Sequence, residues 1–181
     1  MDEIELELVG LLEEAAAKVG VERRAAVLEA LASAVSKALA LRPDELVILI
    51  LTRDRTLLEF GYPSELAEGG INKFPLSVPS LAGRVAQTAR SLLTNAAHDE
   101  PHLDFYERIR IKEGRPRQIQ KLLAVGVKGS DGKVRAVIEV SRRGDARVKA
   151  GPDFRPEDQQ CLERLAATAA PALAAALEWT A

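Results

Sequence analysis

Hydrophobic residues near both ends of the chain recur every three to four positions, which is typical of amphipathic helices. This spacing predicts helices over residues 3–18 and 22–40 near the N-terminus and over residues 156–178 near the C-terminus. Asp2, followed three residues later by Glu5, matches the capping box that opens a helix. The pattern therefore places long helices at both ends of the chain.

Between these helices the period of the pattern changes to that of β-strands. The continuous apolar run Leu46–Leu51 predicts a strand that is buried on both faces. Further strands are expected over residues 56–62, 74–78, 91–94, 119–127 and 133–141, and short helices over 80–89 and about 102–111. Ser130-Asp131-Gly132 marks a hairpin turn between the last two strands. Successive strands joined by hairpins predict an α+β fold with an antiparallel sheet and helices on one side.

Several segments, taken in order, resemble the GAF domain family over roughly residues 23–178. They are the helix Glu22–Leu41 before the buried strand, Ser80–Thr88, Leu122–Val127 with Asp131–Val140, and Phe154–Asp158 before the last helix. The resemblance implies a profilin-like, six-stranded antiparallel sheet with the terminal helices packed on one face. It also implies a small-molecule pocket on the other face, roofed by residues 95–118. Residues 22–181 are then a GAF-like domain, and residues 1–21 are an additional N-terminal helical arm.

Composition and charge exclude several classes of function. The chain has 181 residues and a net charge of −2, which gives no support to nucleic-acid binding. No apolar run reaches the length of a membrane span, and the acidic N-terminus is unlike a signal peptide. The single cysteine, Cys161, excludes an internal disulfide and any site built from several cysteines, and it fits a reducing compartment. We therefore expect a cytoplasmic protein that contacts neither membranes nor nucleic acids.

Few residues suggest catalysis or metal binding. His98 and His102 have the spacing of two metal ligands on one helix face, but Pro101 between them is best placed at the first turn of a helix, which leaves His98 outside it. No serine has a histidine or an acid at the spacing of a catalytic triad. Tetrapyrrole-binding relatives carry their attachment cysteine in the middle region, and the methionine-sulfoxide reductases of the family need more than one cysteine. We predict no enzyme activity, no metal and no cofactor.

The resemblance also gives limited support for a cyclic nucleotide as the ligand. Relatives that bind cyclic nucleotides carry an Asn-Lys pair after the last long strand, followed by a Phe and an Asp-Glu pair. The corresponding residues here are Ser141-Arg142, Phe154 and Asp158-Gln159, so only the Phe and the Asp match. We expect Arg142 and Asp158 to form a structural ion pair instead.

If the pocket is open, its walls should come from the middle strands and the roofing segment. The candidate ligand-binding residues are Phe60, Asn95, His98, Phe105, Tyr106, Gln118, Gln120 and Leu123. This set contains a conflict, because Gln118 and Gln120 share one face of a strand with Leu122 and Leu123 takes the other face.

The sequence also contains two basic runs, over residues 108–121 and 142–149. Charge runs of this kind are usually solvated loops, and the alternative is a surface for an anionic partner or ligand. The acidic first helix of a second subunit is one such partner.

Two hypotheses of function remain open. In the first, the chain is a non-catalytic sensory module that binds a small molecule beneath residues 95–118 and signals through its terminal helices. In the second, side chains fill the pocket and the chain is a dimeric adaptor that docks on a signalling protein. We expect a homodimer through the terminal helices, since their apolar stripes are wide and helix 3–18 adds Leu6, Val9 and Leu12 to its stripe. The competing arrangement is a monomer in which helix 3–18 folds back on its own domain.

Overall fold

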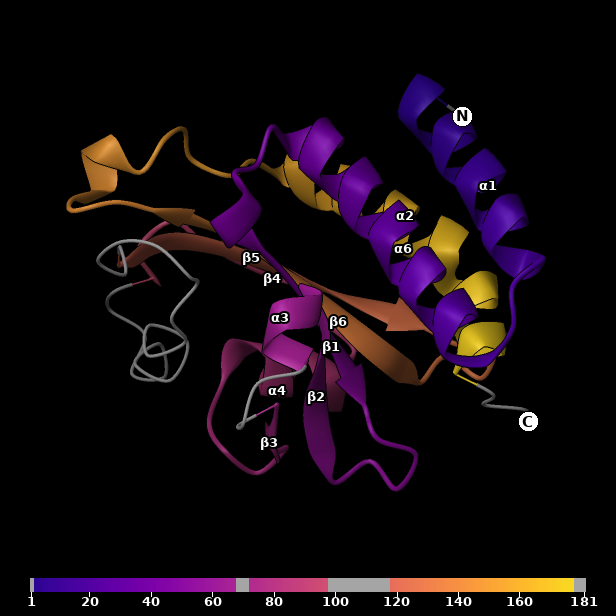
Figure 1. Cartoon of the computed structure of the whole chain (residues 1–181). Helices are drawn as coiled ribbons and strands as arrows, with labels where there is room; N and C mark the ends of the chain where they lie inside the picture. Colours follow the sequence, from indigo (N-terminus) through magenta and orange to yellow (C-terminus); the bar gives the residue numbers. More distant parts are fainter. Residues whose placement is uncertain (1, 68–71, 98–117, 178–181) are drawn as a thin grey trace.

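The computed structural model describes residues 2–67, 72–97 and 118–177, and it contains one antiparallel sheet (Figure 1). The six strands lie in the order β3-β2-β1-β6-β5-β4, and every neighbouring pair is antiparallel. They are β1 (Leu46–Leu51), β2 (Leu57–Tyr62), β3 (Lys73–Pro75), β4 (Leu92–Thr94), β5 (Ile119–Lys128) and β6 (Val134–Arg143). The predicted α+β fold is therefore confirmed, although β3 is shorter than the strand expected over residues 74–78.

The long helices lie on one face of the sheet, as expected. They are α1 (Glu3–Ala16), α2 (Gly20–Leu39) and α6 (Pro156–Ala176). Helices α2 and α6 pack on the strands, and α1 covers α2 and α6 as an outer layer (Figure 1). The shorter elements are η1 (Pro43–Glu45), α3 (Ser64–Ala67), α4 (Leu81–Thr88) and η3 (Arg147–Lys149). Helix α4 packs on β5 and β6 from the opposite side of the sheet to the long helices.

Helix α1 packs against its own chain, which is one of the two arrangements left open by the sequence. Leu8, Leu12 and Ala15 are buried in the core that α1 shares with α2 and α6. The predicted capping box is present, since Asp2 Oδ1 accepts a hydrogen bond from the amide of Glu5 at 2.9 Å. The Glu5 carboxylate in turn accepts one from Arg164 of α6 at 2.8 Å. The cap of α1 is thus also its polar contact with the last helix.

The sheet separates two hydrophobic cores. Ile48 and Leu123 belong to the core beneath the long helices, and their strand neighbours Leu49 and Leu122 belong to the core beneath α4. Because alternate side chains of a strand point to opposite faces, a strand covered on both faces must be apolar throughout. This requirement explains the unbroken apolar run of β1.

The hairpin between β5 and β6 closes where the sequence predicted. The amide of Gly132 donates to the carbonyl of Gly129 at 2.9 Å, and Gly132 has a φ of 75°, a conformation that favours glycine. Asp131 Oδ1 accepts a hydrogen bond from the amide of Lys133 at 3.1 Å. This turn fixes the register of the two longest strands.

Among the helices that the structure describes, none is both long and apolar enough to cross a membrane.

Candidate functional site

Buried polar residues gather at the end of the central strand β6, on the sheet face that also carries α4. Glu139, Ser141 and Arg143 alternate with Ile138 and Val140, which lie in the core beneath the long helices. All three polar residues are less than 10% exposed, at 4%, 5% and 7% respectively. One strand therefore presents a line of buried polar side chains to the face that the resemblance assigns to a ligand.

Glu139 is the most unusual member of this line. It pairs with Val47 of β1 on one side and with Ala124 of β5 on the other, so its strand neighbours are apolar. Its Oε2 atom is buried and has no hydrogen-bond partner among the described residues. Burial raises the pKa of this carboxyl to about 7, while the positive charge of Arg143 opposes the rise. Near neutral pH this side chain can hold or release a proton and can accept a hydrogen bond from a bound molecule.

Arg143 and Gln120 are each held by one side-chain hydrogen bond. The partner of Arg143 is Ser141, and the partner of Gln120 is the backbone just after β6. Arg143 Nε donates to Ser141 Oγ at 3.4 Å, which places the guanidinium group alongside the strand. Gln120 is buried, and its Nε2 donates to the carbonyl of Gly144 at 3.0 Å. The amide of Gly144 donates to the carbonyl of the exposed residue Gln118, also at 3.0 Å. The start of β5 and the end of β6 are thus tied together beside the polar line.

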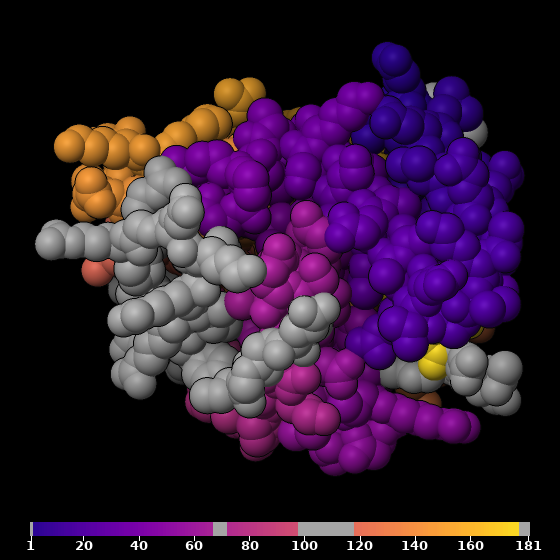
Figure 2. Space-filling model, viewed as in Figure 1, coloured from indigo at the N-terminus to yellow at the C-terminus, as the bar shows by residue number. Residues whose placement is uncertain are grey.

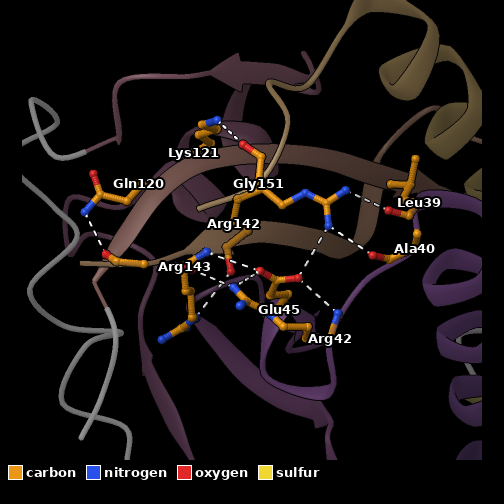
Figure 3. Close-up of polar contacts among 11 residues, drawn as sticks. Leu39, Ala40, Arg42, Glu45, Gln120, Lys121, Arg142, Arg143 and Gly151 are labelled. Atoms are coloured by element: carbon orange, nitrogen blue, oxygen red, sulfur yellow. Dashed lines mark hydrogen bonds and ion pairs between the residues drawn. The ribbon is translucent and has the colours of Figure 1, made fainter. Parts of the chain in front are cut away.

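The adjacent residue Arg142 points to the other face and connects β6 to the C-terminal end of α2 (Figure 3). Its Nη2 donates to the carbonyl of Leu39 at 2.7 Å, and its Nη1 donates to the carbonyl of Ala40 at 3.1 Å. These carbonyls belong to the last turn and the C-cap of the helix, where cations are favourable. The guanidinium carbon also lies 5.3 Å from the centre of the Phe154 ring, just before α6. Arg142 therefore contacts the C-terminal end of α2 and the segment that leads into α6.

The buried carboxylate of Glu45 joins these two neighbouring arginines (Figure 3). Its Oε1 accepts a hydrogen bond from the amide of Arg143 at 3.2 Å, and its Oε2 lies 3.4 Å from Arg142 Nη1. Arg42 donates to the same carboxylate from its guanidinium at 2.5 Å and from its amide at 3.0 Å. Glu45 thus holds both Arg143, whose side chain belongs to the buried polar line, and Arg142, whose side chain contacts the helices.

The predicted ion pair between Arg142 and Asp158 is wrong. Both residues lie within the described part of the chain, and Arg142 pairs with Glu45 instead. Asp158 accepts a hydrogen bond from the amide of Arg155 at 2.8 Å, which caps its own helix. The sequence indicated a positive charge at position 142 but gave no sign that the helix carbonyls and Glu45 would compete for it.

Asn95 holds the end of β4 to the segment before α6. Its side-chain amide donates to the carbonyl of Phe154, and its carbonyl oxygen accepts from the amide of Phe154, both at 2.9 Å. This reciprocal pair is a strong positional constraint at the start of the segment predicted to roof the pocket. Asn95 therefore has a structural role in addition to its predicted contact with a ligand.

The remaining candidate pocket residues divide into three groups. Phe60 is buried beneath α4 and packs against Phe74 with 6.1 Å between the ring centres. Leu123 lies in the core beneath the long helices, so its placement in the pocket is wrong, and strand alternation is the reason. His98, Phe105 and Tyr106 lie outside the described residues.

The two basic runs, predicted to be solvated loops, are only partly so. Lys121 and Arg143 are buried at the ends of β5 and β6, whereas Arg147 and Lys149 are exposed as expected, and residues 108–117 lie outside the described part of the chain. Lys121 is buried, and its Nζ contacts Asp153 at 2.8 Å and the carbonyl of Gly151 at 2.5 Å. Arg147 lies 3.4 Å from the same Asp153 carboxylate. These contacts lower the pKa of Asp153 and attach the loop before α6 to the sheet.

Two observations concern metal binding and thiol chemistry in the described residues. Within residues 2–67, 72–97 and 118–177, no three histidine, cysteine, aspartate or glutamate side chains form a group that could hold a metal ion. Burial raises the pKa of the half-buried thiol of Cys161, which reduces the thiolate fraction near neutral pH.

Sequence reasoning missed Glu139 and Glu45, and it assigned Lys121 only to a basic run without expecting it to be buried. The available signal was a charged residue within or next to an otherwise apolar strand. Glu139 stands between Ile138 and Val140, at a position where both faces of the sheet are covered. Such a charge has to be compensated by a partner, a proton or a ligand.

Comparisons with known proteins agree with this architecture. A GAF domain family model matches residues 22–174. The GAF domain from an Acinetobacter phosphoenolpyruvate-protein phosphotransferase is 19% identical, with a TM-score of 0.67, and the match covers 100% of this chain and 99% of that one. Residues 122 to 287 of a methyl-accepting chemotaxis protein give a TM-score of 0.67 at 14% identity, covering 99% and 100%. A GAF domain from a Coxiella burnetii phosphoenolpyruvate-protein phosphotransferase gives 0.64 at 14% identity, covering 97% of each chain.

At these identities the solved structures establish the fold alone, and no curated protein sequence matches the chain. The family model carries the assignment further, because it spans most of the sequence and begins at the second long helix. The order of strands and the packing of the terminal helices on one face agree with it. The chain therefore belongs to the GAF domain family.

Proposed function

We propose that this chain is a regulatory module that binds a small molecule against the sheet face carrying Glu139 and signals through its terminal helices. GAF domains are in general regulatory or sensory modules that bind small molecules. The observation that carries the proposal is the buried Oε2 atom of Glu139, which has no hydrogen-bond partner within residues 2–67, 72–97 and 118–177. A buried polar atom left without a partner is costly, and a donor on a bound ligand would remove that cost.

The same strand offers a route from this site to the helices. Arg143 acts electrostatically on Glu139, and its amide is held by Glu45. Glu45 also contacts Arg142, which holds the C-terminal carbonyls of α2. A ligand that draws Glu139 or Arg143 toward itself would strain this connection and shift α2 relative to the sheet.

The predicted pocket residues fit this proposal to different degrees. Phe60, Asn95, Gln118 and Gln120 remain proposed contacts at the floor and the edge of the site. His98, Phe105 and Tyr106 remain proposed contacts from the roof. The proposal involves no cofactor, no metal and no catalytic residue, and it places the chain in the cytoplasm as a partner of a signalling protein.

The test compares the wild-type chain with Glu139→Gln, which keeps the shape of the side chain and removes its charge. Native mass spectrometry of protein purified without added ligand identifies any retained molecule. Thermal-shift measurements then use a panel of small amines, amidines and amides as hydrogen-bond donors, with matched carboxylates as controls. We expect a donor compound to raise the melting temperature of the wild type more than that of Glu139→Gln. Equal shifts in both proteins, or no shift and no retained molecule, would contradict the proposal.

The packing of the α4-side core supports a second candidate function. Phe60, Phe74, Leu122 and Val137 occupy this core together with Val85 of α4. If side chains also fill the rest of this face, the chain is a dimeric adaptor with a pocket that binds nothing. Light scattering on the full chain, and on a chain that starts at Val21, tests the dimer and the contribution of α1 to it. A full chain that is monomeric at micromolar concentration would exclude this candidate.

A further inference from the structure

A groove runs between α1 and α2 on the outer surface of the helical layer. Figure 2 shows the atoms of the two helices side by side on this surface, in indigo and violet. The groove has a volume of about 630 Å³ and is open to solvent. On α2 it extends from Glu22 to Ser33, which is about 16 Å along the helix axis, or three helical turns.

The floor of this groove is made of small apolar side chains. Helix α2 contributes Ala25, Ala26 and Ala30, and α1 contributes Leu11 and Ala15. Alanines let the backbone of another helix come close. Ala26 and Ala30 are four residues apart and share one side of α2, and Ala25 lies next to Ala26 at the exposed edge of the floor. The groove can therefore accept the apolar face of a third helix.

The rim of the groove is acidic. It carries the exposed carboxylates Glu14, Glu22 and Glu29 against one ammonium group, Lys18. Within the described residues none of these three carboxylates forms an ion pair, whereas the neighbouring Glu7 and Glu5 pair with Lys37 and Arg164. These three carboxylates therefore leave a net negative charge along the rim of the groove.

The connection between α1 and α2 adds exposed apolar surface at one end. Val19 and Val21, which flank the groove residues Lys18 and Glu22, are 73% and 84% exposed. Large apolar side chains at this exposure next to an apolar groove are typical of an interaction surface.

We propose that this groove is the docking site for a basic amphipathic helix of a partner protein. The apolar face of that helix lies on the alanine floor, and its Lys or Arg side chains meet Glu14, Glu22 and Glu29. A second copy of this chain fits less well. A two-fold contact through the groove would bring its acidic rim against the identical rim of the second copy, and like charges close to each other are destabilising.

The experiment uses the full chain and two labelled synthetic helical peptides. One has Leu on one face and Lys on the other, and the second has Glu in place of every Lys. Fluorescence anisotropy should detect binding of the basic peptide alone, and the affinity should fall as the salt concentration rises. The triple variant Glu14→Gln, Glu22→Gln and Glu29→Gln should weaken binding about tenfold.

A matched control removes the same number of charges elsewhere, through Glu13→Gln, Asp145→Asn and Glu157→Gln. These residues are exposed and lie outside the groove, so binding of the basic peptide should not change. Ala25→Trp, at an exposed position of the floor, should block binding without altering charge. No binding of the basic peptide, or equal loss in the two triple variants, would overturn the proposal. A full chain that is dimeric in light scattering and becomes monomeric with Ala25→Trp would also overturn it, because a second copy then fills the groove.

Discussion

Glu45 and Arg142 form a contact of 3.4 Å in which the carboxylate is buried and the guanidinium nearly so, with side-chain exposures of 1% and 11%. The pair joins the end of β6 to η1 and to the C-terminal end of α2. Arg142 reaches the C-terminal carbonyls of α2, and Glu45 also holds the amide of Arg143, whose charge acts on Glu139. A chain of polar contacts therefore links the candidate site around Glu139 to the C-terminal end of α2.

Replacing Glu45 by Gln should destabilise the fold. The substitution leaves two guanidinium groups without their buried counter-charge, and breaking such a pair typically costs about 3 kcal/mol. Urea denaturation measures the loss in the free energy of unfolding. Asp131→Asn, which removes the exposed partner of Arg135, is the control and should cost at most about 1 kcal/mol. Equal effects of the two substitutions would contradict the role assigned to Glu45.

Glu139 should make the stability of the chain depend on pH. Its pKa in the folded state is about 7, against an ordinary value of 4.5. Between these two values the folded chain binds more protons than the unfolded chain, so the free energy of unfolding decreases as the pH rises. The decrease should be about 3 kcal/mol and should be complete above pH 7.

Denaturation curves from pH 4 to pH 8 measure this effect, and Glu139→Gln should remove this part of the pH dependence. The variant should then be more stable than the wild type at pH 8. Glu13→Gln, at an exposed position of α1, is the control and should keep the wild-type slope. If Glu139→Gln keeps the same slope, burial of Glu139 does not perturb its titration.

Asn95→Ala should loosen the attachment of β4 to the segment before α6. The substitution removes both hydrogen bonds with Phe154, and their loss should cost about 2 kcal/mol. Hydrogen–deuterium exchange should be faster at the amide of Phe154. Ser91→Ala removes the exposed contact of Ser91 with Glu163 and should leave that amide protected. An unchanged exchange rate in Asn95→Ala would show that other contacts hold this segment.

Helix α1 should contribute to the stability of the domain. Leu8 is fully buried against α2 and α6, so Leu8→Ala should cost about 3 kcal/mol. Leu6, on the same helix, is 55% exposed, and Leu6→Ala should cost less than about 1 kcal/mol. Urea denaturation of both variants measures the difference. A small effect of Leu8→Ala would mean that α1 separates from the domain in solution, as a mobile arm would.

Local patterns in the sequence were sufficient for the family and for the longer helices and strands, whereas the short helix α3 was not predicted. The helix expected over about 102–111 lies outside the described residues. The apolar run Leu46–Leu51, the turn at Gly132 and the capping box of Asp2 and Glu5 depend on neighbouring residues, and each is present as predicted. The two hydrophobic cores also follow from the sequence, because strand alternation determines which side chains share a face. Leu122 and Leu123 had to be on opposite faces, and the sequence left open only which face each one takes.

Tertiary structure alone decided the partners of the charged residues. The sequence allowed an ion pair between Arg142 and Asp158. Folding instead brings Glu45 and the end of α2 into contact with Arg142, although they are about a hundred positions away along the chain. The burial of Glu139 likewise depends on how the sheet is covered, which no local pattern records. Apolar contacts are non-directional and follow the periodicity of each element, whereas a charge is governed by the few atoms that meet it in the folded chain. The sequence therefore determined the scaffold, and the three-dimensional arrangement determined the candidate site.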